Sequence, residues 1–237
     1  MPDLLETTRR QLKTLASPGF ADQLRWFFKE PVDPYGVRSP EIQRVSRDLY
    51  QALKSWPVAE RDQFMEELWK SGKLEEGVVA THVYRRFSKE CGPREFAMFE
   101  RWINRYVRNW SHTDGVASWL IAASIANRPE LMSKIPAWTK SRNRWKRRAA
   151  AVSFLQEAKQ GRNTENIFKI CDVLRDDPDE MVQKGVGWVL KETYPKKPSE
   201  VLQFLESWRS TAPRLVLRYA AEKMAPQDKR WLLQRNS

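Results

Sequence analysis

The segment WKRRAAAVSFLQEA, residues 145–158, decides the fold because two later segments repeat its pattern. These are VQKGVGWVLKETY, residues 182–194, and PRLVLRYAAEKM, residues 213–224. Aligning Arg148, Lys184 and Arg218 places a basic residue 36 and then 34 positions further along, each followed by small and apolar residues. A period of this length is typical of stacked helix pairs, in which each unit buries its apolar face only against its neighbours. Chance similarity of three amphipathic helices is the alternative interpretation.

Helical spacing extends outward from this repeat over most of the chain. Ile42, Val45, Leu49 and Leu53 form one buried stripe, which Ser39-Pro40 opens as N-cap and first-turn proline. Prolines fall where successive helices should begin or end. Further apolar stripes predict helices at 60–70, 76–89, 94–107, 115–126, 145–158, 164–174, 180–193, 199–208 and 213–224. We therefore predict an all-α fold, a HEAT-like repeat solenoid of stacked antiparallel helix pairs with a basic concave face, in a single domain over residues 1–237.

The N-terminal region before Ser39 falls outside the repeat. It contains Trp26, Phe27 and Phe28 in a row, and we expect it to pack on the first repeat as a cap. Aromatic residues of this kind belong to a core more often than to a ligand site.

Positive charge is concentrated in the middle of the chain. The formal net charge is +12, of which residues 1–100 contribute nothing, 101–160 contribute +9 and 161–237 contribute +3. Residues 138–148, WTKSRNRWKRR, hold six basic residues and two tryptophans without an acid. A concentrated positive field with interleaved aromatics favours a polyanion such as DNA, although a solvated basic face is the alternative. Arg148 is the strongest candidate for a phosphate contact; the others are Arg144, Arg147, Lys184 and Lys191.

Cysteine and histidine are scarce. Cys91 and Cys171 are far apart and form no CxxC motif, and His82 and His112 cannot build a metal centre by themselves. We expect no metal, no organic cofactor and no disulfide. No run of eighteen apolar residues is present, so we expect no membrane partner and a cytoplasmic protein. We also expect a monomer.

Three residues are candidates for chemistry. Trp110 and Asp114, in RNWSHTDGVASW, lie four apart and so share one side of a helix, or lie close at its first turn if that helix begins near Thr113. In the second case the helix dipole favours the ionised carboxylate. The simpler interpretation is that Asp114 caps a helix and Trp110 fills the core. The third residue is Trp188, which shares a helical face with Lys184 and Lys191.

Glycines flank Trp188 in the sequence. Gly185 and Gly187 place almost no side-chain bulk on either side of Trp188, which favours an exposed position for this indole over a core position.

Taken together, these segments resemble the AlkD family of bacterial alkylpurine DNA glycosylases. The resemblance runs from YGVRSPEIQRVSRDL at residue 35 through RNWSHTD and WKRRAAAV to QKGVGWVLKE at residue 183, the most specific of the four. It implies a HEAT-like solenoid that binds duplex DNA and hydrolyses the N-glycosidic bond of cationic N3- or N7-alkylated purines, such as 3-methyladenine and 7-methylguanine, in base excision repair. It also implies that the base is not rotated into a recognition pocket.

The resemblance assigns roles to individual residues. Asp114 matches the catalytic aspartate of the family, Trp110 and Trp188 match its paired tryptophans, and Arg148 matches its DNA-contacting arginine. The chain departs from the pattern at Asn109, Ser111 and His112, where the family commonly has a second tryptophan and an acid. We expect His112 to be a surface histidine.

Three hypotheses follow from the sequence. The first is a monofunctional alkylpurine DNA glycosylase. The second is a non-catalytic repeat protein that binds distorted or branched DNA, which the departures around Trp110 allow and the presence of Asp114 and Trp188 opposes. The third is a scaffold for an acidic protein partner; strongly salt-dependent binding to random duplex DNA would count against it.

Overall fold

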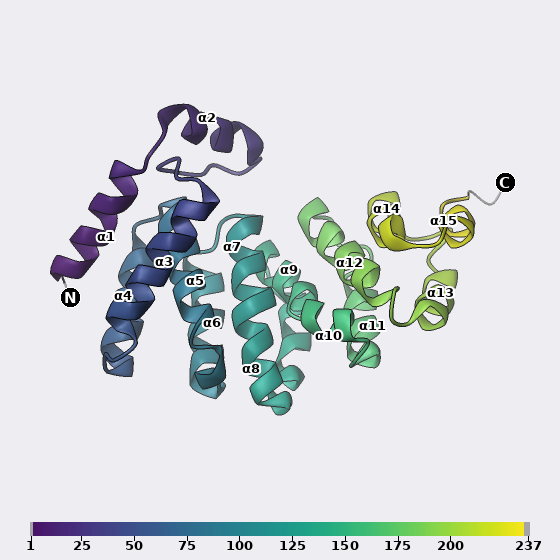
Figure 1. Cartoon of the computed structure of the whole chain (residues 1–237). Coiled ribbons are helices and arrows are strands. Elements are labelled where there is room, and N and C mark those ends of the chain that lie inside the picture. Colours follow the sequence, from purple (N-terminus) through teal and green to yellow (C-terminus); the bar gives the residue numbers. More distant parts are fainter. Residues whose placement is uncertain (1, 235–237) are drawn as a thin grey trace. The chain divides into compact units, whose positions relative to one another are not determined.

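The computed structural model describes residues 2–234, and over this range it is helical throughout, with no strand (Figure 1). The backbone pairs outside helices at one isolated bridge, between Asp33 and Lys73. The prediction of an all-α fold is confirmed.

Two compact units make up the chain, one ending at Val116 and the other beginning at Ala117. The boundary lies within a π-helical segment, η2 (Val116–Ile121), that continues directly from the preceding helix. A π-helical turn holds one more residue than an α-helical turn and often occurs at functional sites.

Four long helices of the first unit, α3 to α6, match apolar stripes of the sequence. Helix α3 packs on α5, α4 packs on the same helix, and the N-terminal α1 packs on α3. Leu49, Leu53, Phe64 and Val83 are among its buried side chains. The helices of this unit are α1 (Pro2–Thr14), α2 (Pro18–Phe27), α3 (Ser39–Leu53), α4 (Val58–Lys70), α5 (Leu74–Arg85), η1 (Ser88–Glu90), α6 (Pro93–Arg105) and α7 (Trp110–Gly115).

The second unit contains the repeat that decides the fold. The three similar segments contain α9 (Arg144–Val152), α12 (Glu180–Thr193) and α14 (Arg214–Ala220). The prediction of one helix over 145–158 is wrong, because the chain turns at Ser153 and Phe154 before α10 begins at Leu155. Helix α12 packs against α9 on one side and α14 on the other, so the repeated helices stack in sequence order (Figure 1). The other helices of the unit are α8 (Ala122–Asn127), η3 (Pro129–Lys140), α10 (Leu155–Gln160), α11 (Thr164–Val173), α13 (Pro198–Glu206), η4 (Ala221–Lys223) and α15 (Pro226–Leu233).

One proline falls inside an element instead of at its end. Pro136 lies within the 3-10 helix η3, whereas the sequence interpretation placed every such proline at a helix boundary. Because proline has no N–H, Pro136 cannot donate to the carbonyl three residues earlier, so one hydrogen bond of η3 is missing at this point.

Both cysteines are buried thiols, Cys91 in the first unit and Cys171 in the second. Burial raises the pKa of Cys91 to about 12 and raises the pKa of Cys171 further. Each therefore remains a protonated core side chain.

Candidate active site

Helix α7 positions two of the three candidate residues. Asn109 is its N-cap, with an extended backbone and a side-chain Oδ1 that accepts a hydrogen bond from the His112 N–H at 2.9 Å. The helix consequently begins at Trp110, and Asp114 lies one turn further along on the same side. Of the two arrangements compatible with the sequence, the structure has the first.

Asp114 is a half-exposed carboxylate within the helix and not its cap. The N-cap position belongs to Asn109, which removes the simpler interpretation of Asp114. Because the helix begins at Trp110, Asp114 also lies beyond the first turn, where the stabilisation of a negative charge by the helix dipole has fallen off.

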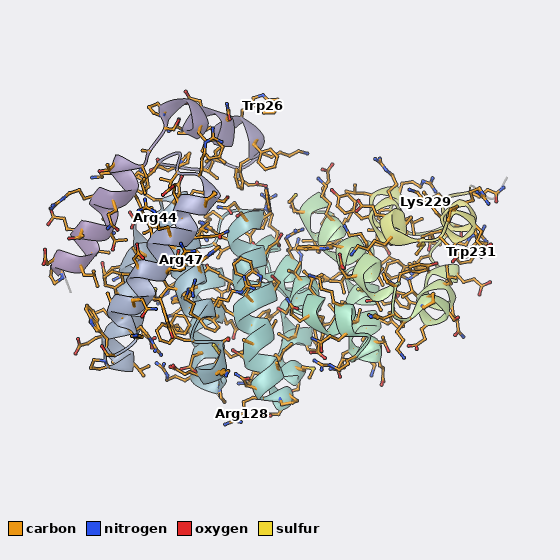
Figure 2. The ribbon with its side chains drawn as sticks, viewed as in Figure 1. Trp26, Arg44, Arg47, Arg128, Lys229 and Trp231 are labelled. Carbon is orange, nitrogen blue, oxygen red and sulfur yellow. The ribbon has the colours of Figure 1, made fainter. Side chains whose placement is uncertain are left out.

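Trp110 belongs to a cluster of aromatic rings with α2. Its indole stacks on Phe28, with ring centroids 5.1 Å apart and planes within 16°, and meets the edge of Phe27 at 5.9 Å. Phe28 is buried, but Phe27 is 60 % exposed and Trp26 is 88 % exposed. Figure 2 shows Trp26 on α2 with its ring projecting away from the ribbon.

The expectation that all three aromatics before Ser39 are core residues is therefore wrong for Trp26 and Phe27. Only Phe28 turns inward, and it supports Trp110. The aromatic surface beside Asp114 is larger than the motif around Trp110 indicates.

His112 is buried, and the expectation of a surface histidine is wrong. Its Nε2–H donates to the Leu74 carbonyl at 2.8 Å, while Nδ1 lies 3.3 Å from the Asn109 amide. Burial lowers the pKa of His112 to about 4, so the imidazole is neutral. It lies on the α7 face that carries Asn109, and it holds the start of the helix in place.

In the second unit, Trp188 is a half-buried residue of α12. The apolar stripe of this helix, Val182, Val186, Val189 and Leu190, is buried as predicted. Lys184, Trp188 and Lys191 are all partly exposed, which agrees with the predicted second face.

The two glycines beside Trp188 have a different role from the one that the sequence suggested. A Cβ at Gly187 would lie 2.4 Å from the Cβ of Tyr219 and 2.8 Å from the Val216 carbonyl oxygen, both on α14. A Cβ at Gly185 would meet the Arg148 Cγ at 3.3 Å. Both glycines are buried and allow neighbouring helices to approach closely; they do not clear a surface.

Arg148 is only 5 % exposed, although the sequence analysis makes it the strongest candidate for a phosphate contact. Trp145 and Ala149 on either side of it are buried, and the Arg148 stem lies in the space left by Gly185. Its guanidinium donates to the Met181 carbonyl of α12. A phosphate contact by Arg148 stays a prediction.

The remaining basic candidates take part in ion pairs within the unit. Arg147 binds Asp177 with two hydrogen bonds, at 2.6 and 3.0 Å, and Arg144 pairs with Asp179 at 2.8 Å. Asp179 is also the N-cap of α12. Lys191 pairs with Glu222 at 2.7 Å, and Lys184 lies 3.9 Å from Glu180. The ion pairs of Arg144 and Arg147 therefore connect α9 to the start of α12, and that of Lys191 connects α12 to η4.

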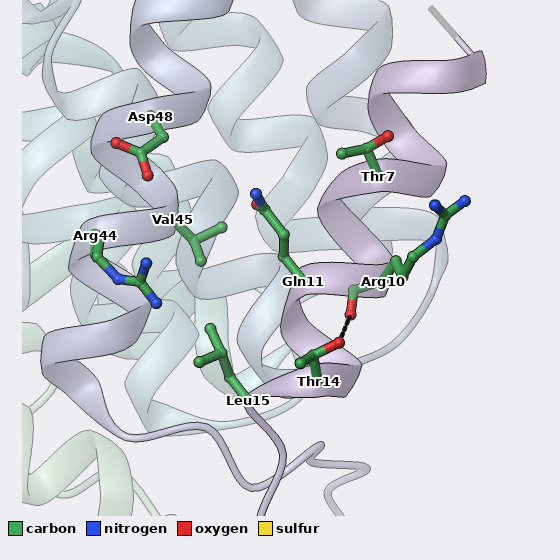
Figure 3. A pocket seen from close by; sticks show the side chains of 8 residues that line it. All are labelled: Thr7, Arg10, Gln11, Thr14, Leu15, Arg44, Val45 and Asp48. Carbon is green, nitrogen blue, oxygen red and sulfur yellow. Dashed lines mark hydrogen bonds between the residues drawn. The ribbon is translucent and has the colours of Figure 1, made fainter.

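Another pocket in the first unit lies apart from α7. It has a volume of about 240 Å³ and lies between α1 and α3, where Asp48 is its one carboxylate (Figure 3). Arg44 at its edge is paired with Glu41 at 2.6 Å. No aromatic ring lines it, so it offers none of the chemistry found around Trp110.

Comparison with known proteins identifies the family. The sequence model described as "DNA alkylation repair enzyme" matches residues 8–224, which is most of the chain. The chain belongs to the DNA alkylation repair enzyme family. A search among curated proteins gave no significant match.

Solved structures share the helical fold of this chain. A predicted DNA alkylation repair enzyme from Enterococcus faecalis is 20 % identical and has a TM-score of 0.80, covering 89 % of this chain and 97 % of its own. AlkD2 from Streptococcus mutans is 19 % identical with a TM-score of 0.61, covering 86 % and 97 %. The protein smu.31 from Streptococcus mutans UA159 is 20 % identical with a TM-score of 0.60, covering 78 % and 98 %. At these identities the likeness shows a shared helical fold.

Two further findings bear on the chemistry of this family member. Among residues 2–234, no group of three histidine, cysteine or acidic side chains could hold a metal ion. Within the same range, no helix combines the length and the apolar character needed to cross a membrane.

Proposed function

We propose that this member of the DNA alkylation repair enzyme family is a monofunctional glycosylase that excises cationic N3- or N7-alkylated purines from duplex DNA. The observation that carries the proposal is the pairing of Asp114 with Trp110 on one side of α7, next to the exposed ring of Phe27. Such excision is the first step of base excision repair.

The alkylated purine is the leaving group of this reaction, and it needs little activation by the protein. Alkylation at N3 or N7 makes the purine a cation, so it departs without first being protonated. The sugar becomes an oxocarbenium-like cation as the bond breaks, and a fixed carboxylate stabilises that charge and orients the attacking water. Asp114 is the carboxylate that we assign to this role.

The tryptophans act on the base and the basic residues act on the backbone. We assign Trp110 and Trp188 to contacts with the cationic nucleotide because an indole has an electron-rich face, and each such contact contributes about 0.5–2 kcal/mol, depending on desolvation. Arg148, with Arg144, Arg147, Lys184 and Lys191, would hold phosphates, because phosphate contacts set the position of the protein on the duplex.

The test is a single-turnover excision assay with Asp114→Asn on duplex DNA that contains 7-methylguanine. The variant keeps its shape and loses only the charge, so we expect unchanged duplex affinity and a rate lowered by roughly 100-fold or more, as for loss of an electrostatic stabiliser. Asp48→Asn, an exposed carboxylate of α3, is the matched control and should excise at the wild-type rate.

An unchanged rate in Asp114→Asn would remove the catalytic assignment. If the wild-type protein itself binds methylated duplex DNA but releases no free base, the non-catalytic DNA-binding hypothesis replaces the glycosylase.

A further inference from the structure

Helix α2 carries aromatic rings to the proposed catalytic pair, but in the part of the chain that the structure describes it does not pack along another helix. At its C-terminal end, Phe28 stacks on Trp110 with ring centroids 5.1 Å apart. At its N-terminal end, Ser17 is the N-cap, and the Ser17 N–H donates to the Gly36 carbonyl at 3.1 Å. The loop that follows α2, residues 28–38, therefore returns to the start of the helix (Figure 1).

Gly36 brings this loop into close contact with the start of α2. Its φ is +86°, and a Cβ there would collide with the Ser17 carbonyl oxygen and lie 2.7 Å from the backbone nitrogen of Ala21. Glycine is the residue that combines a left-handed backbone with so close an approach. The position of residues 35–37 therefore determines the position of α2.

A buried carboxylate fixes residues 35–37 to α5. Glu75 is only 1 % exposed and lies in the first turn of this helix. Its Oε2 accepts a hydrogen bond from the Tyr35 N–H at 2.8 Å, and its Oε1 accepts from the N–H groups of Gly36 and Val37 at 2.8 and 3.0 Å. Hydrogen bonds to a carboxylate are stronger than those between neutral groups. Both oxygens of Glu75 are thus used on the loop that holds α2.

The same turn of α5 also holds α7. The Leu74 carbonyl accepts the hydrogen bond of the His112 Nε2–H at 2.8 Å. Gly77 leaves room for the His112 ring, because a Cβ at this position would lie 2.7 Å from Nε2. Helices α2 and α7 are therefore both placed against the start of α5, and the stacking of Phe28 on Trp110 joins them at the proposed catalytic pair.

We propose that Glu75 is a positioning residue for base excision, which acts by fixing α2 so that Phe28 supports the Trp110 indole beside Asp114. This inference rests on the proposed function, because it takes Trp110 and Asp114 as the catalytic pair. Glu75 has no part in the chemistry itself, since its carboxylate is buried and binds backbone amides. It sets the orientation of a ring that contacts the nucleotide in the proposed reaction.

A carboxylate suits this role better than a neutral amide of the same shape. A carboxylate has two acceptor oxygens and no donor, whereas a glutamine side chain keeps one oxygen and brings an NH₂ group. In Glu75→Gln the NH₂ group would face either the Tyr35 N–H or the N–H groups of Gly36 and Val37. At least one backbone donor then loses its acceptor, so we expect the loop to shift and α2 to shift with it.

The test is single-turnover excision of 7-methylguanine from duplex DNA by Glu75→Gln. We expect the rate to fall by about ten-fold or more, because a misplacement of about 1 Å can lower a catalytic rate by roughly 100-fold. Glu95→Gln is the matched control and should excise at the wild-type rate. It alters another buried carboxylate, in the first turn of α6, which accepts from the Gly92 N–H at 2.9 Å and does not contact α2 or its loop.

Two further readouts separate positioning from a general loss of stability. Fluorine NMR of protein that contains 5-fluorotryptophan reports the surroundings of the Trp110 ring, whose resonance is assigned with Trp110→Phe. We expect this resonance to shift in Glu75→Gln and in Phe28→Leu but not in Glu95→Gln. In a double-mutant cycle, Glu75→Gln and Phe28→Leu together should lower the excision rate little more than either alone, because both act through the same ring.

The proposal is overturned if folded Glu75→Gln excises at the wild-type rate, if its Trp110 resonance is unchanged, or if the two rate losses multiply in the double variant. Glu75→Asp covers the event that Glu75→Gln does not fold. It keeps the charge but is one methylene shorter, so it should shift the resonance in the same direction and lower the rate less. If Asp114→Asn excises normally, the catalytic assignment fails, while the Trp110 resonance still tests whether Glu75 positions α2.

Discussion

His112 is held as a neutral imidazole inside the first unit, and this makes the fold sensitive to acid. The folded pKa of about 4 is below the ordinary value of 6.5. A group whose pKa is lowered on folding stabilises the native state fully above its unfolded pKa and progressively less as the pH falls toward its folded pKa. The stability that depends on this residue is therefore present above pH 6.5 and is lost between 6.5 and about 4.

We expect the free energy of unfolding of His112→Gln to fall less steeply with decreasing pH than that of wild type. The change in the His112 pKa from 6.5 to about 4 corresponds to at most about 3 kcal/mol, at 1.36 kcal/mol for each pH unit. Urea unfolding on both sides of this pH window would measure it. His82, whose pKa is also lowered by burial, provides the comparison: His82→Gln should leave the His112-dependent part of the slope intact. Equal slopes in wild type and His112→Gln would contradict the assignment.

The helical period placed some of these residues correctly and not others. It predicts that Trp110 and Asp114 share one side, and Asn109 is a preferred N-cap type that could have fixed the start of the helix. It does not show that His112 faces the Leu74 carbonyl 38 residues earlier, because that contact depends on how α5 and α7 pack. The sequence also does not predict that Trp26 and Phe27 are exposed, because exposure too depends on how the helices pack.

At the scale of elements, the close approach of α12 and α14 depends on Gly187. We expect Gly187→Ala to destabilise the protein by about 1–3 kcal/mol, because the new methyl group would lie within 2.4 Å of Tyr219 and against the backbone of α14. Thermal or urea unfolding would measure the change.

Gly185→Ala is the matched control on the same helix. Its methyl group would meet the Arg148 Cγ at 3.3 Å, a side-chain atom that has to move by only a few tenths of an ångström, and alanine has the higher helix propensity by about 1 kcal/mol, so we expect little loss or a small gain in stability. Equal destabilisation by both substitutions would show that the α12–α14 contact is not what requires glycine.

The elements predicted from the sequence are those with long apolar stripes bounded by proline, such as α3, α6 and α12. Helices α1 and α2 and the 3-10 helix η3 were not predicted. Helix η3 repeats every three residues and contains Pro136, so a search for a 3.6-residue period does not detect it. The similarity of three segments did predict that α9, α12 and α14 stack in order.

At the scale of the whole molecule, the charge of +9 over residues 101–160 predicts salt-dependent DNA binding. Ion pairs within the protein use part of that charge, but Arg128, Lys140 and Arg142 are exposed and have no carboxylate partner among the described residues. If about four phosphates are neutralised, affinity for random duplex should fall roughly 100-fold between about 50 and 200 mM salt.

Arg142→Ala should reduce the slope of log affinity against log salt by about one, whereas Arg47→Ala, in the charge-balanced N-terminal part, should not. Binding titrations at several salt concentrations provide the measurement. Affinity that does not change with salt would favour the protein-scaffold hypothesis.

The net charge of the sequence predicts a polyanion partner, but it does not show which basic side chains are already held in ion pairs within the protein. Arg147 appears in the sequence as one of six basic residues, yet it is tied to Asp177 by two hydrogen bonds. The acids that bind Arg144 and Arg147 are about 30 residues later, so only the packing of α9 against the start of α12 reveals the pairs.

The burial of both cysteines has a chemical consequence for a DNA alkylation repair protein. Alkylating electrophiles attack thiolates, and Cys91 and Cys171 are neither ionised nor accessible at neutral pH. The same reagents that damage DNA thus find no reactive thiolate in this repair protein.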